Sequence, residues 1–310
     1  MRPASIREAL TGPVASQRVP FTRDGEIDWE GLAASISFNI AAGSKTILLT
    51  YGDSLFSLLT DAEVAEVTSF VCDVVAGSAM VTAACHEYAT PAAVEFGRFC
   101  RAAGVDVLML MPPGWGGSAT AETLLAHFDA VGAEMPLMIV TNIFASGGTQ
   151  FGLRCLERLL ECQAIVAVKD DLLGEFGRKM TQIGSASSQL MVRDRWAVFA
   201  GGQKQNHLDL HPYGCDGYLS TFITFAPEIA TRYWSAIERD DVVAAVEVIR
   251  DCDMPFFDHA RSAVGGFDAV IHGAMELAGI CGRWRRLPYH SLTEEQMDSL
   301  ADLLHEIEVV

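Results

Sequence analysis

The chain has 310 residues, of which half are hydrophobic and one fifth are charged, the composition of a folded globular protein. Its 40 acidic and 22 basic residues give a formal net charge of −18 at pH 7. Such a surface repels the phosphates of nucleic acids and of anionic membranes, so we expect neither as a partner. The eight cysteines form no CxxC pair, and no signal peptide or membrane-spanning run is recognisable. We therefore expect a cytoplasmic protein with reduced thiols.

Short apolar runs alternate with stretches of helical spacing up to about residue 220. The predicted strands are Thr46–Thr50, Met80–Ala84, Val105–Met111, Leu137–Thr141, Ile165–Val168, Ala197–Ala200 and Gly217–Ser220. The predicted helices between them include Asp61–Val75, Pro91–Ala103, Ala121–Ala130 and Gly152–Glu161. Nearly continuous apolar strands are typical of a sheet buried on both faces, and their alternation with helices predicts parallel strands. The pattern fits an α/β fold of the (β/α)8 TIM-barrel type. An open doubly wound sheet has a similar pattern, but no GxGxxG or P-loop motif is present.

The strand pattern ends after Pro227. Three helices are predicted from there on, Glu228–Asp251, Pro255–Leu277 and Thr293–Val310. Thr293 is a suitable N-cap for the last, because acidic side chains follow it at the positive end of the helix. We therefore predict a barrel over residues 1–227 and a C-terminal three-helix domain over residues 228–310.

Eight segments in the same order resemble the dihydrodipicolinate synthase / N-acetylneuraminate lyase family. They are VPFTRDGEIDWEGL, the region between Gly43 and Leu59-Thr60, AAGVDVLMLMPP, LMIVTNI, AIVAVKDD, Phe199-Ala200-Gly201-Gly202, GCDGYLSTFITFAPE and GRWRRLPYHSLTEEQ. The resemblance implies a (β/α)8 barrel with a C-terminal helical extension, usually in a homotetramer. It also implies class I aldolase chemistry on 2-oxo acids, in which a barrel lysine forms an imine and no cofactor takes part.

Lys169 directly follows the apolar run Ile165–Val168, and the resemblance makes it the imine-forming lysine. At the end of a barrel strand its amine lies on the C-terminal face, where the active sites of such barrels are found. Desolvation disfavours the ammonium form of a buried lysine, and the neutral amine attacks a ketone. The alternative is a structural ion pair of this strand-end lysine with Asp170 or Asp171.

Other catalytic positions of the family are replaced in this chain. Thr141 stands at the family's proton-relay tyrosine, and Ser146 stands at an arginine that often binds a distal carboxylate. Gly114, followed by Trp115, stands at a second tyrosine. These losses argue against dihydrodipicolinate synthase itself. Thr141 remains a candidate catalytic residue, with a hydroxyl far less acidic than that of tyrosine.

The loop that holds the substrate carboxylate in the family corresponds here to residues 51–55 in an ungapped register, or to residues 50–53 with a gap. In either register Asp53 lies within it, where its charge repels an acid substrate. Asp53 is therefore turned away, protonated, or the acid–base group that replaces the tyrosine. The other interpretation is a turn aspartate that bonds its own backbone. Tyr51, Gly52 and Ser54 are candidate substrate-binding residues.

His86 follows a strand, at a place where a barrel residue reaches the mouth, so it is a candidate base or substrate-binding group; the alternative is a loop histidine. Gly201 and Gly202 stand at an SGDD-type loop of the family, and the resemblance makes them candidate substrate-binding residues. We expect no metal, because no HExxH motif is present. The candidate ligands for a metal are His207 and His211, which have the i, i+4 spacing of a helix, with Asp209 between them.

These observations predict a Schiff-base lyase, an aldolase or a dehydratase, that acts through Lys169 on a 2-oxo acid or a deoxy sugar acid. The partners expected are a small carbonyl substrate and further copies of the chain, in a tetramer or a dimer. Two alternatives stay open. One is a lysine-dependent enzyme for a carbonyl substrate that is not an acid. The other is a barrel that has lost turnover and serves as a binding or sensor protein.

Overall fold

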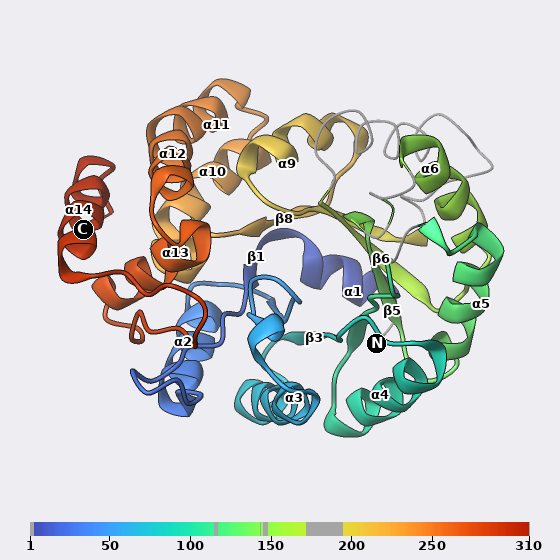
Figure 1. Cartoon of the computed structure of the whole chain (residues 1–310). Helices are drawn as coiled ribbons and strands as arrows, with labels where there is room; N and C mark the ends of the chain where they lie inside the picture. The colour runs from blue at the N-terminus through green and yellow to red at the C-terminus, as the bar shows by residue number, and fades with distance from the viewer. Residues whose placement is uncertain (1–2, 115–116, 143, 145–147, 172–194, 310) are drawn as a thin grey trace.

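The computed structural model describes residues 3–114, 117–142, 144, 148–171 and 195–309. Its strands form a closed barrel in which neighbours are parallel and β1 pairs with β8 (Figure 1). The strands are β1 (Gly12–Ser16), β2 (Thr46–Leu48), β3 (Met80–Ala84), β4 (Val107–Met109), β5 (Leu137–Val140), β6 (Ile165–Asp170), β7 (Ala197–Ala200) and β8 (Gly217–Ser220). The predicted (β/α)8 barrel is confirmed.

Strand β1 is absent from the sequence-based prediction because GPVAS has no long apolar run and contains a proline. Its carbonyls and amides are nevertheless paired with both β2 and β8. Strand β6 runs two residues further than predicted, through Asp170. Lys169 therefore lies within the strand, opposite Val140 of β5 and Phe199 of β7. This pairing fixes the backbone of the lysine on both sides.

Helices surround the barrel in the order expected of βα units. They are α2 (Trp29–Ala41), α3 (Asp61–Val75), α4 (Thr90–Ala103), α5 (Ala121–Gly132), α6 (Gly148–Leu159), α9 (Lys204–Leu210) and α10 (Pro227–Glu238). Short 3-10 turns lie at η1 (Phe56–Leu58), η4 (His211–Tyr213) and η5 (Phe222–Thr224). Helix α3 begins with a capping box, in which Thr60 and Glu63 each bind the other's backbone N–H. Among the described residues, no helix has both the length and the apolar character needed to span a membrane.

One end of the barrel is covered by α1 (Pro3–Leu10), which lies across the opening in Figure 1. Arg7 attaches it to the start of two strands, through Asp216 at 3.0 Å and the Trp196 carbonyl at 2.6 Å. A side chain at Gly217 would approach the Leu10 carbonyl oxygen to 2.2 Å, so the close packing of α1 requires glycine there. These contacts lie at the N-terminal ends of the strands, opposite the face where active sites form.

The C-terminal region contains more helices than the three predicted. They are α11 (Val242–Val248), a π-helical turn η6 (Ile249–Asp253), α12 (Met254–Ser262), α13 (Gly266–Leu277) and α14 (Glu294–Glu306). The first predicted helix is broken between α10 and α11, where Asp240 has a positive φ of 56° and Asp241 caps α11. The predicted cap at Thr293 is confirmed, since its hydroxyl accepts the Gln296 N–H.

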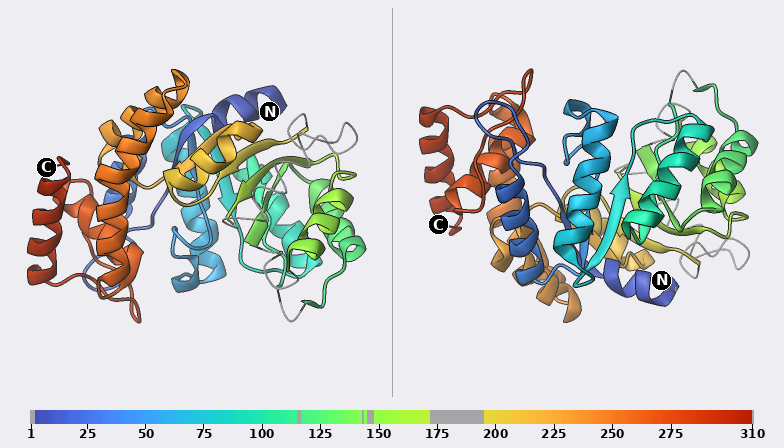
Figure 2. Two further views of the ribbon diagram at one scale, coloured as in Figure 1. Left: turned by 90° about the horizontal axis from the view of Figure 1, so that it is seen from above. Right: turned by 90° about the horizontal axis from the view of Figure 1, so that it is seen from below.

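Figure 2 shows these orange and red helices gathered on one side of the barrel. Helix α10 packs against both β1 and α11, and so connects the barrel to the helices that follow. The division into residues 1–227 and 228–310 therefore stays a prediction. The placement matters for the site, because α12 and α13 reach the C-terminal ends of the strands.

Candidate active site

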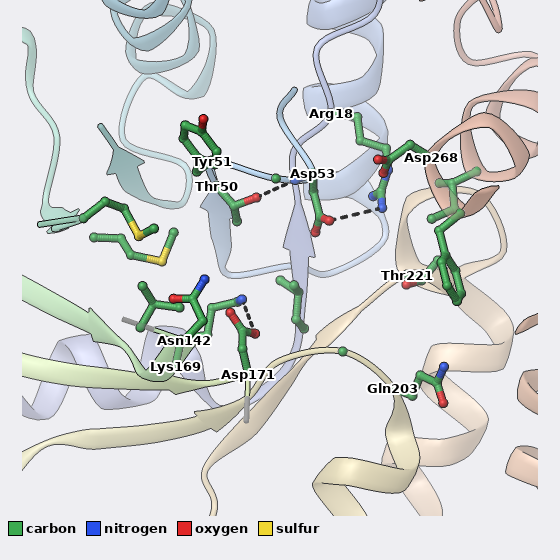
Figure 3. A pocket seen from close by; sticks show the side chains of 18 of the residues that line it. Arg18, Thr50, Tyr51, Asp53, Asn142, Lys169, Asp171, Gln203, Thr221 and Asp268 are labelled. Atoms are coloured by element: carbon green, nitrogen blue, oxygen red, sulfur yellow. Dashed lines mark hydrogen bonds and ion pairs between the residues drawn. The ribbon is translucent and has the colours of Figure 1, made fainter. Parts of the chain in front are cut away.

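A cavity of about 470 Å³ lies at the C-terminal ends of the barrel strands (Figure 3). Its walls come from the ends of β1, β2, β4, β5, β6, β7 and β8 or from the residues that follow them, and α12 and α13 close one side. Parallel strands of a barrel present their carboxyl ends on one face, so side chains from distant parts of the chain meet there. The ten residues labelled in Figure 3 carry the polar side chains of its lining.

Lys169 lines this cavity and is only 6% exposed. Its amine donates a hydrogen bond to Asp171 Oδ1, the contact drawn in Figure 3. The side chain of Asp171 is 24% exposed and also lines the cavity. The ion pair considered from the sequence is thus present, and it lies inside the cavity rather than sealed in the core.

Asp53 also lines the cavity, together with Arg18, which the sequence analysis did not select. Asp53 Oδ2 accepts the Ser16 hydroxyl at 2.6 Å, and Oδ1 lies 3.9 Å from the Arg18 guanidinium. Burial raises the pKa of Asp53, but Arg18, the Ser16 hydroxyl and Lys169 outweigh it and leave the pKa below its ordinary value. The geometry therefore favours an ionised Asp53 turned toward Arg18, and not the protonated form considered above.

Arg18 is a buried cation at the cavity wall, 3% exposed. Its Nη1 donates to the Ser16 carbonyl at 3.5 Å, and among the residues the structure describes its Nε has no hydrogen-bond partner. It follows β1, whereas Asp53 follows β2, and the two approach because Ser16 pairs with Leu48 across these strands. No local sequence pattern predicts that Arg18 and Asp53 lie close together.

The loop after β2 is held by its own hydroxyl groups. The Thr50 hydroxyl accepts the Asp53 N–H at 2.9 Å, as a turn of this kind requires. Ser54 is fully buried, accepts the Thr50 N–H at 2.9 Å and donates to the Gln17 carbonyl at 2.6 Å. Tyr51 and Gly52 line the cavity, whereas Ser54 shapes the loop from beneath.

Thr141 and Gly201 lie beside the lysine pair but do not line the cavity. The Thr141 hydroxyl donates to Asp170 Oδ1 at 2.7 Å and accepts the Asp171 N–H at 2.9 Å. Gly201 packs directly against the Asp171 carboxylate. Gly202, next along the chain, does line the cavity, as expected. Catalytic and binding roles of these residues stay predictions.

His86 lies outside the lining of the cavity. Its Nδ1 lies 2.6 Å from Asp61 Oδ1, and its Nε2 lies 3.0 Å from the Phe56 carbonyl oxygen. Tyr88 donates to the same Asp61 oxygen at 2.6 Å. The rings of His86 and Tyr51 pack edge to face, with their centroids 5.9 Å apart. His86 is thus connected to the cavity through Tyr51.

The side of the cavity formed by α13 was not foreseen from the sequence. Asp268 reaches the lining near Arg18, as Figure 3 shows. Burial raises the pKa of Asp268 above its ordinary value against the lowering influence of Arg18. Apolar side chains of α12 and α13 complete this wall, with Phe257 5% and Ile271 2% exposed.

Ser146, which stands at a replaced family position, and Trp115, which follows another at Gly114, lie outside the described residues. Gly114 is exposed, and its N–H donates to Glu87 at 3.4 Å. Of the histidines weighed as metal ligands, His207 bonds the Tyr233 hydroxyl at 2.8 Å. Within the described part of the chain, no group of three or more His, Cys, Asp or Glu side chains is arranged to hold a metal ion.

A closed parallel barrel with a polar cavity at the C-terminal ends of its strands defines a (β/α)8 enzyme. Residues 9–307 match the model of the dihydrodipicolinate synthetase family, and the chain belongs to that family. A probable 5-dehydro-4-deoxyglucarate dehydratase of Streptomyces coelicolor is 25% identical over 315 residues, covering 100% of this chain and 98% of the relative. An uncharacterized DapA-like lyase of Rhizobium meliloti is 25% identical over 309 residues, covering 99% of each chain.

The fold agrees with solved structures as well. Dihydrodipicolinate synthase of Oceanobacillus iheyensis superimposes with a TM-score of 0.84 at 21% identity, covering 100% of both chains. Together the family and the relatives identify the chain as a lyase, and the prediction of an enzyme of this class is confirmed. The expectation that it is not dihydrodipicolinate synthase itself agrees with the names of these two relatives.

Proposed function

We propose that the chain is a Schiff-base lyase in which the amine of Lys169 attacks the ketone carbon of a 2-oxo acid. The observation that carries this proposal is a 6% exposed lysine whose amine faces a cavity at the catalytic end of a barrel. The protonated imine withdraws electrons from the neighbouring carbon, which permits cleavage of a C–C bond or loss of a hydroxyl group.

The substrate class we propose is a deoxy sugar acid that loses water. Two observations support it. The Streptomyces coelicolor relative is named for dehydration of 5-dehydro-4-deoxyglucarate, a keto acid with a second carboxylate. In addition, Arg18 lines the cavity as a buried cation, and guanidinium groups bind carboxylates with strong charge-assisted hydrogen bonds. Arg18 would replace the arginine that the family has at the position of Ser146.

Loss of one charged hydrogen bond to the substrate predicts a KM for the acid about 10- to 100-fold higher in Arg18→Gln, with imine formation at Lys169 retained. An unchanged KM would remove Arg18 from the binding site.

The same wall also supports a second candidate. Asp53, ionised by its environment, repels an acid and favours a neutral carbonyl compound. Reaction of an ester or amide of the keto acid in preference to the free acid would support this candidate over the first.

The test of the lysine is trapping with borohydride, read by intact mass. The wild type, incubated with pyruvate or with 5-dehydro-4-deoxyglucarate, is expected to gain the mass of the reduced adduct. Lys169→Ala is expected to gain none, whereas Lys45→Ala, which removes an exposed lysine, labels like the wild type. Equal labelling of Lys169→Ala and wild type would overturn the proposal. A wild type that binds these compounds without an adduct would support a binding or sensor protein.

We further propose a homo-oligomer, a dimer or a tetramer, in the cytoplasm. Helix α11 supports the homo-oligomer, because its Val242, Val243 and Val246 are 51%, 72% and 45% exposed. A second copy of the chain would cover such apolar side chains. Light scattering at micromolar concentration tests it, and Val243→Glu is expected to weaken the assembly. A wild type that is monomeric and fully active would refute it.

A further inference from the structure

The carboxylate of Asp171 is in direct contact with the Lys169 amine. Its Oδ1 accepts a hydrogen bond from Nζ, and its side chain, 24% exposed, borders the cavity. A substrate that reaches Lys169 therefore meets Asp171 as well. A general acid–base group must lie within hydrogen-bonding reach of the proton it moves, and Asp171 meets this requirement before any substrate is bound.

The backbone of Asp171 is fixed by hydrogen bonds to the adjoining strands. Its N–H donates to the Thr141 hydroxyl at 2.9 Å, and that hydroxyl donates in turn to Asp170 Oδ1 at 2.7 Å. The N–H of Gly201 donates to the Asp170 carbonyl at 2.7 Å. Thr141 thus holds Asp171 in place, and its hydroxyl is engaged rather than directed at a substrate.

Gly201 makes room for the carboxylate. A Cβ at residue 201 would lie 1.8 Å from Asp171 Oδ1 and 2.9 Å from its Cγ. Both distances are far below a van der Waals contact, and Oδ1 is the oxygen that contacts Lys169. Any side chain at 201 would therefore displace Asp171 from the amine.

The other groups considered as proton relays have different partners. Asp53 bonds Ser16 and faces Arg18, and His86 bonds Asp61 and the Phe56 carbonyl. Neither is placed against the lysine amine by these contacts. Asp171, two positions after the lysine, is therefore better placed for the acid–base role than Asp53, the candidate from the sequence.

We propose that Asp171 is the proton-transfer residue of this enzyme and that Gly201 is the positioning residue that keeps it on the lysine; both inferences rest on the proposed Schiff-base function. Asp171 first takes a proton from the Lys169 ammonium. The neutral amine forms the N–C bond to the ketone as the carbonyl π bond breaks, and the carbonyl oxygen takes the proton back from Asp171.

Asp171 then removes a second proton from the nitrogen and delivers it to the new hydroxyl, so that the C–O bond breaks and water leaves. One ammonium and one ketone become one protonated imine and one water, and Asp171 is again a carboxylate. The Asp171 carboxylate then removes a proton from the carbon next to the imine carbon, and the imine becomes an enamine. The enamine electrons expel the hydroxyl of the next carbon as water, with the proton that Asp171 holds, and a C=C bond forms.

The test compares Asp171→Asn and Asp171→Ala with the exposed control Asp73→Asn in the full-length enzyme. We expect kcat to fall by about 10²- to 10⁴-fold in both Asp171 variants and to stay within twofold of the wild type in the control. Borohydride is still expected to trap the imine at Lys169 at long times, but with a slower approach. The pH profile of kcat should lose one ionisation, and added formate should restore part of the turnover of Asp171→Ala, in which space for it is left.

Gly201→Ala is the second variant, because it retains the carboxylate and only moves it. We expect the same fall in kcat, with a KM close to that of the wild type and no rescue by formate. Ordinary turnover with an unchanged pH profile in Asp171→Asn, while the imine is trapped at Lys169, would overturn the assignment of Asp171 alone. No adduct in the wild type would overturn the proposed function, and this inference with it.

Discussion

Two buried lysines of this protein each form an ion pair with an aspartate. Lys169, on β6, binds Asp171, and Lys204, at the start of α9, binds Asp253 at the end of η6. Both lysines are nearly inaccessible, at 6% and 1% exposed. Their partners differ, because the Asp171 side chain is 24% exposed and the Asp253 side chain only 4%.

The surroundings of the two pairs explain the difference. The Lys204 amine lies 4.2 Å from the centre of the Phe222 ring, and Asp253 belongs to the helices that follow the barrel. Burial raises the pKa of Asp253 against the lowering effect of Lys204. This pair joins α9 to the C-terminal region and is sealed. The Lys169 pair opens on a cavity of about 470 Å³. A buried lysine–aspartate pair therefore does not by itself indicate chemistry, whereas access to a cavity does.

The largest expected effect that separates the two pairs is on turnover. Lys169→Ala should reduce turnover to background, because no other described residue that lines the cavity carries an amine, while Lys204→Met should retain turnover in whatever fraction stays folded. We expect Lys169→Ala to change the free energy of unfolding by only about 1 kcal/mol, since the Asp171 carboxylate it leaves behind is accessible to water. Steady-state assays and urea unfolding on the same samples measure both quantities. Substantial turnover in Lys169→Ala would contradict the comparison.

The second effect is on stability. Lys204→Met leaves Asp253 without its cation in a sealed site, which typically costs about 3–5 kcal/mol. Lys45→Met, at an exposed lysine, should lie within about 0.5 kcal/mol of the wild type. The double variant Lys204→Met/Asp253→Leu should recover much of the loss, because an apolar pair needs no compensating charge. If Lys204→Met lowered the free energy of unfolding by less than about 1 kcal/mol, the Lys204–Asp253 pair would not be sealed from water.

The alternation of apolar runs with helical stretches predicts parallel strands and places Lys169 at a strand end, because both depend on local sequence. The resemblance to the family added the closed barrel and the imine-forming role of Lys169. An apolar run followed by lysine reports a strand end, and strand ends of a parallel barrel share one face. Strand β1 is missed since its five residues include a glycine and a proline. Asp53, Tyr51, Gly52 and Gly202 were selected through the same resemblance, because they stand at loops that form the site in the family, and all four line the cavity.

The rest of the cavity depends on packing between distant segments. Arg18 meets Asp53 through the pairing of β1 with β2, and Asp268 reaches the mouth because α13 packs there. Neither placement follows from a local motif. Asp171 was considered only as a structural partner of Lys169, since sequence alone does not reveal that Gly201 leaves room for its carboxylate beside the amine. The direction of His86, toward Asp61, is likewise set by tertiary packing.

A third ion pair, Glu63–Arg286, extends the comparison to the surface and gives the smallest expected effect. Arg286 donates to both carboxylate oxygens of Glu63, at 3.1 and 2.8 Å, and these side chains are 23% and 24% exposed. The hydrogen bond from Arg286 is the main cause that lowers the pKa of Glu63 from 4.5 to about 2. The unfolded chain therefore binds the proton more readily than the folded chain between these two values. The stabilisation is complete above about pH 4.5 and is lost as the pH falls toward about 2.

Glu63→Gln removes this titration and retains an amide oxygen that accepts the Thr60 N–H, so the cap of α3 is preserved. We expect the variant to be less stable than the wild type by about 1–2 kcal/mol at pH 7, allowing for solvent screening, and equally stable near pH 2. Glu66→Gln, on an exposed position of the same helix, controls for the loss of a carboxylate. Urea unfolding of the three proteins from pH 7 to pH 2 measures the difference. A stability gap between Glu63→Gln and wild type that does not narrow as the pH falls would mean that Arg286 stabilises the protein through its bonds to the Gly25 and Leu58 carbonyls instead.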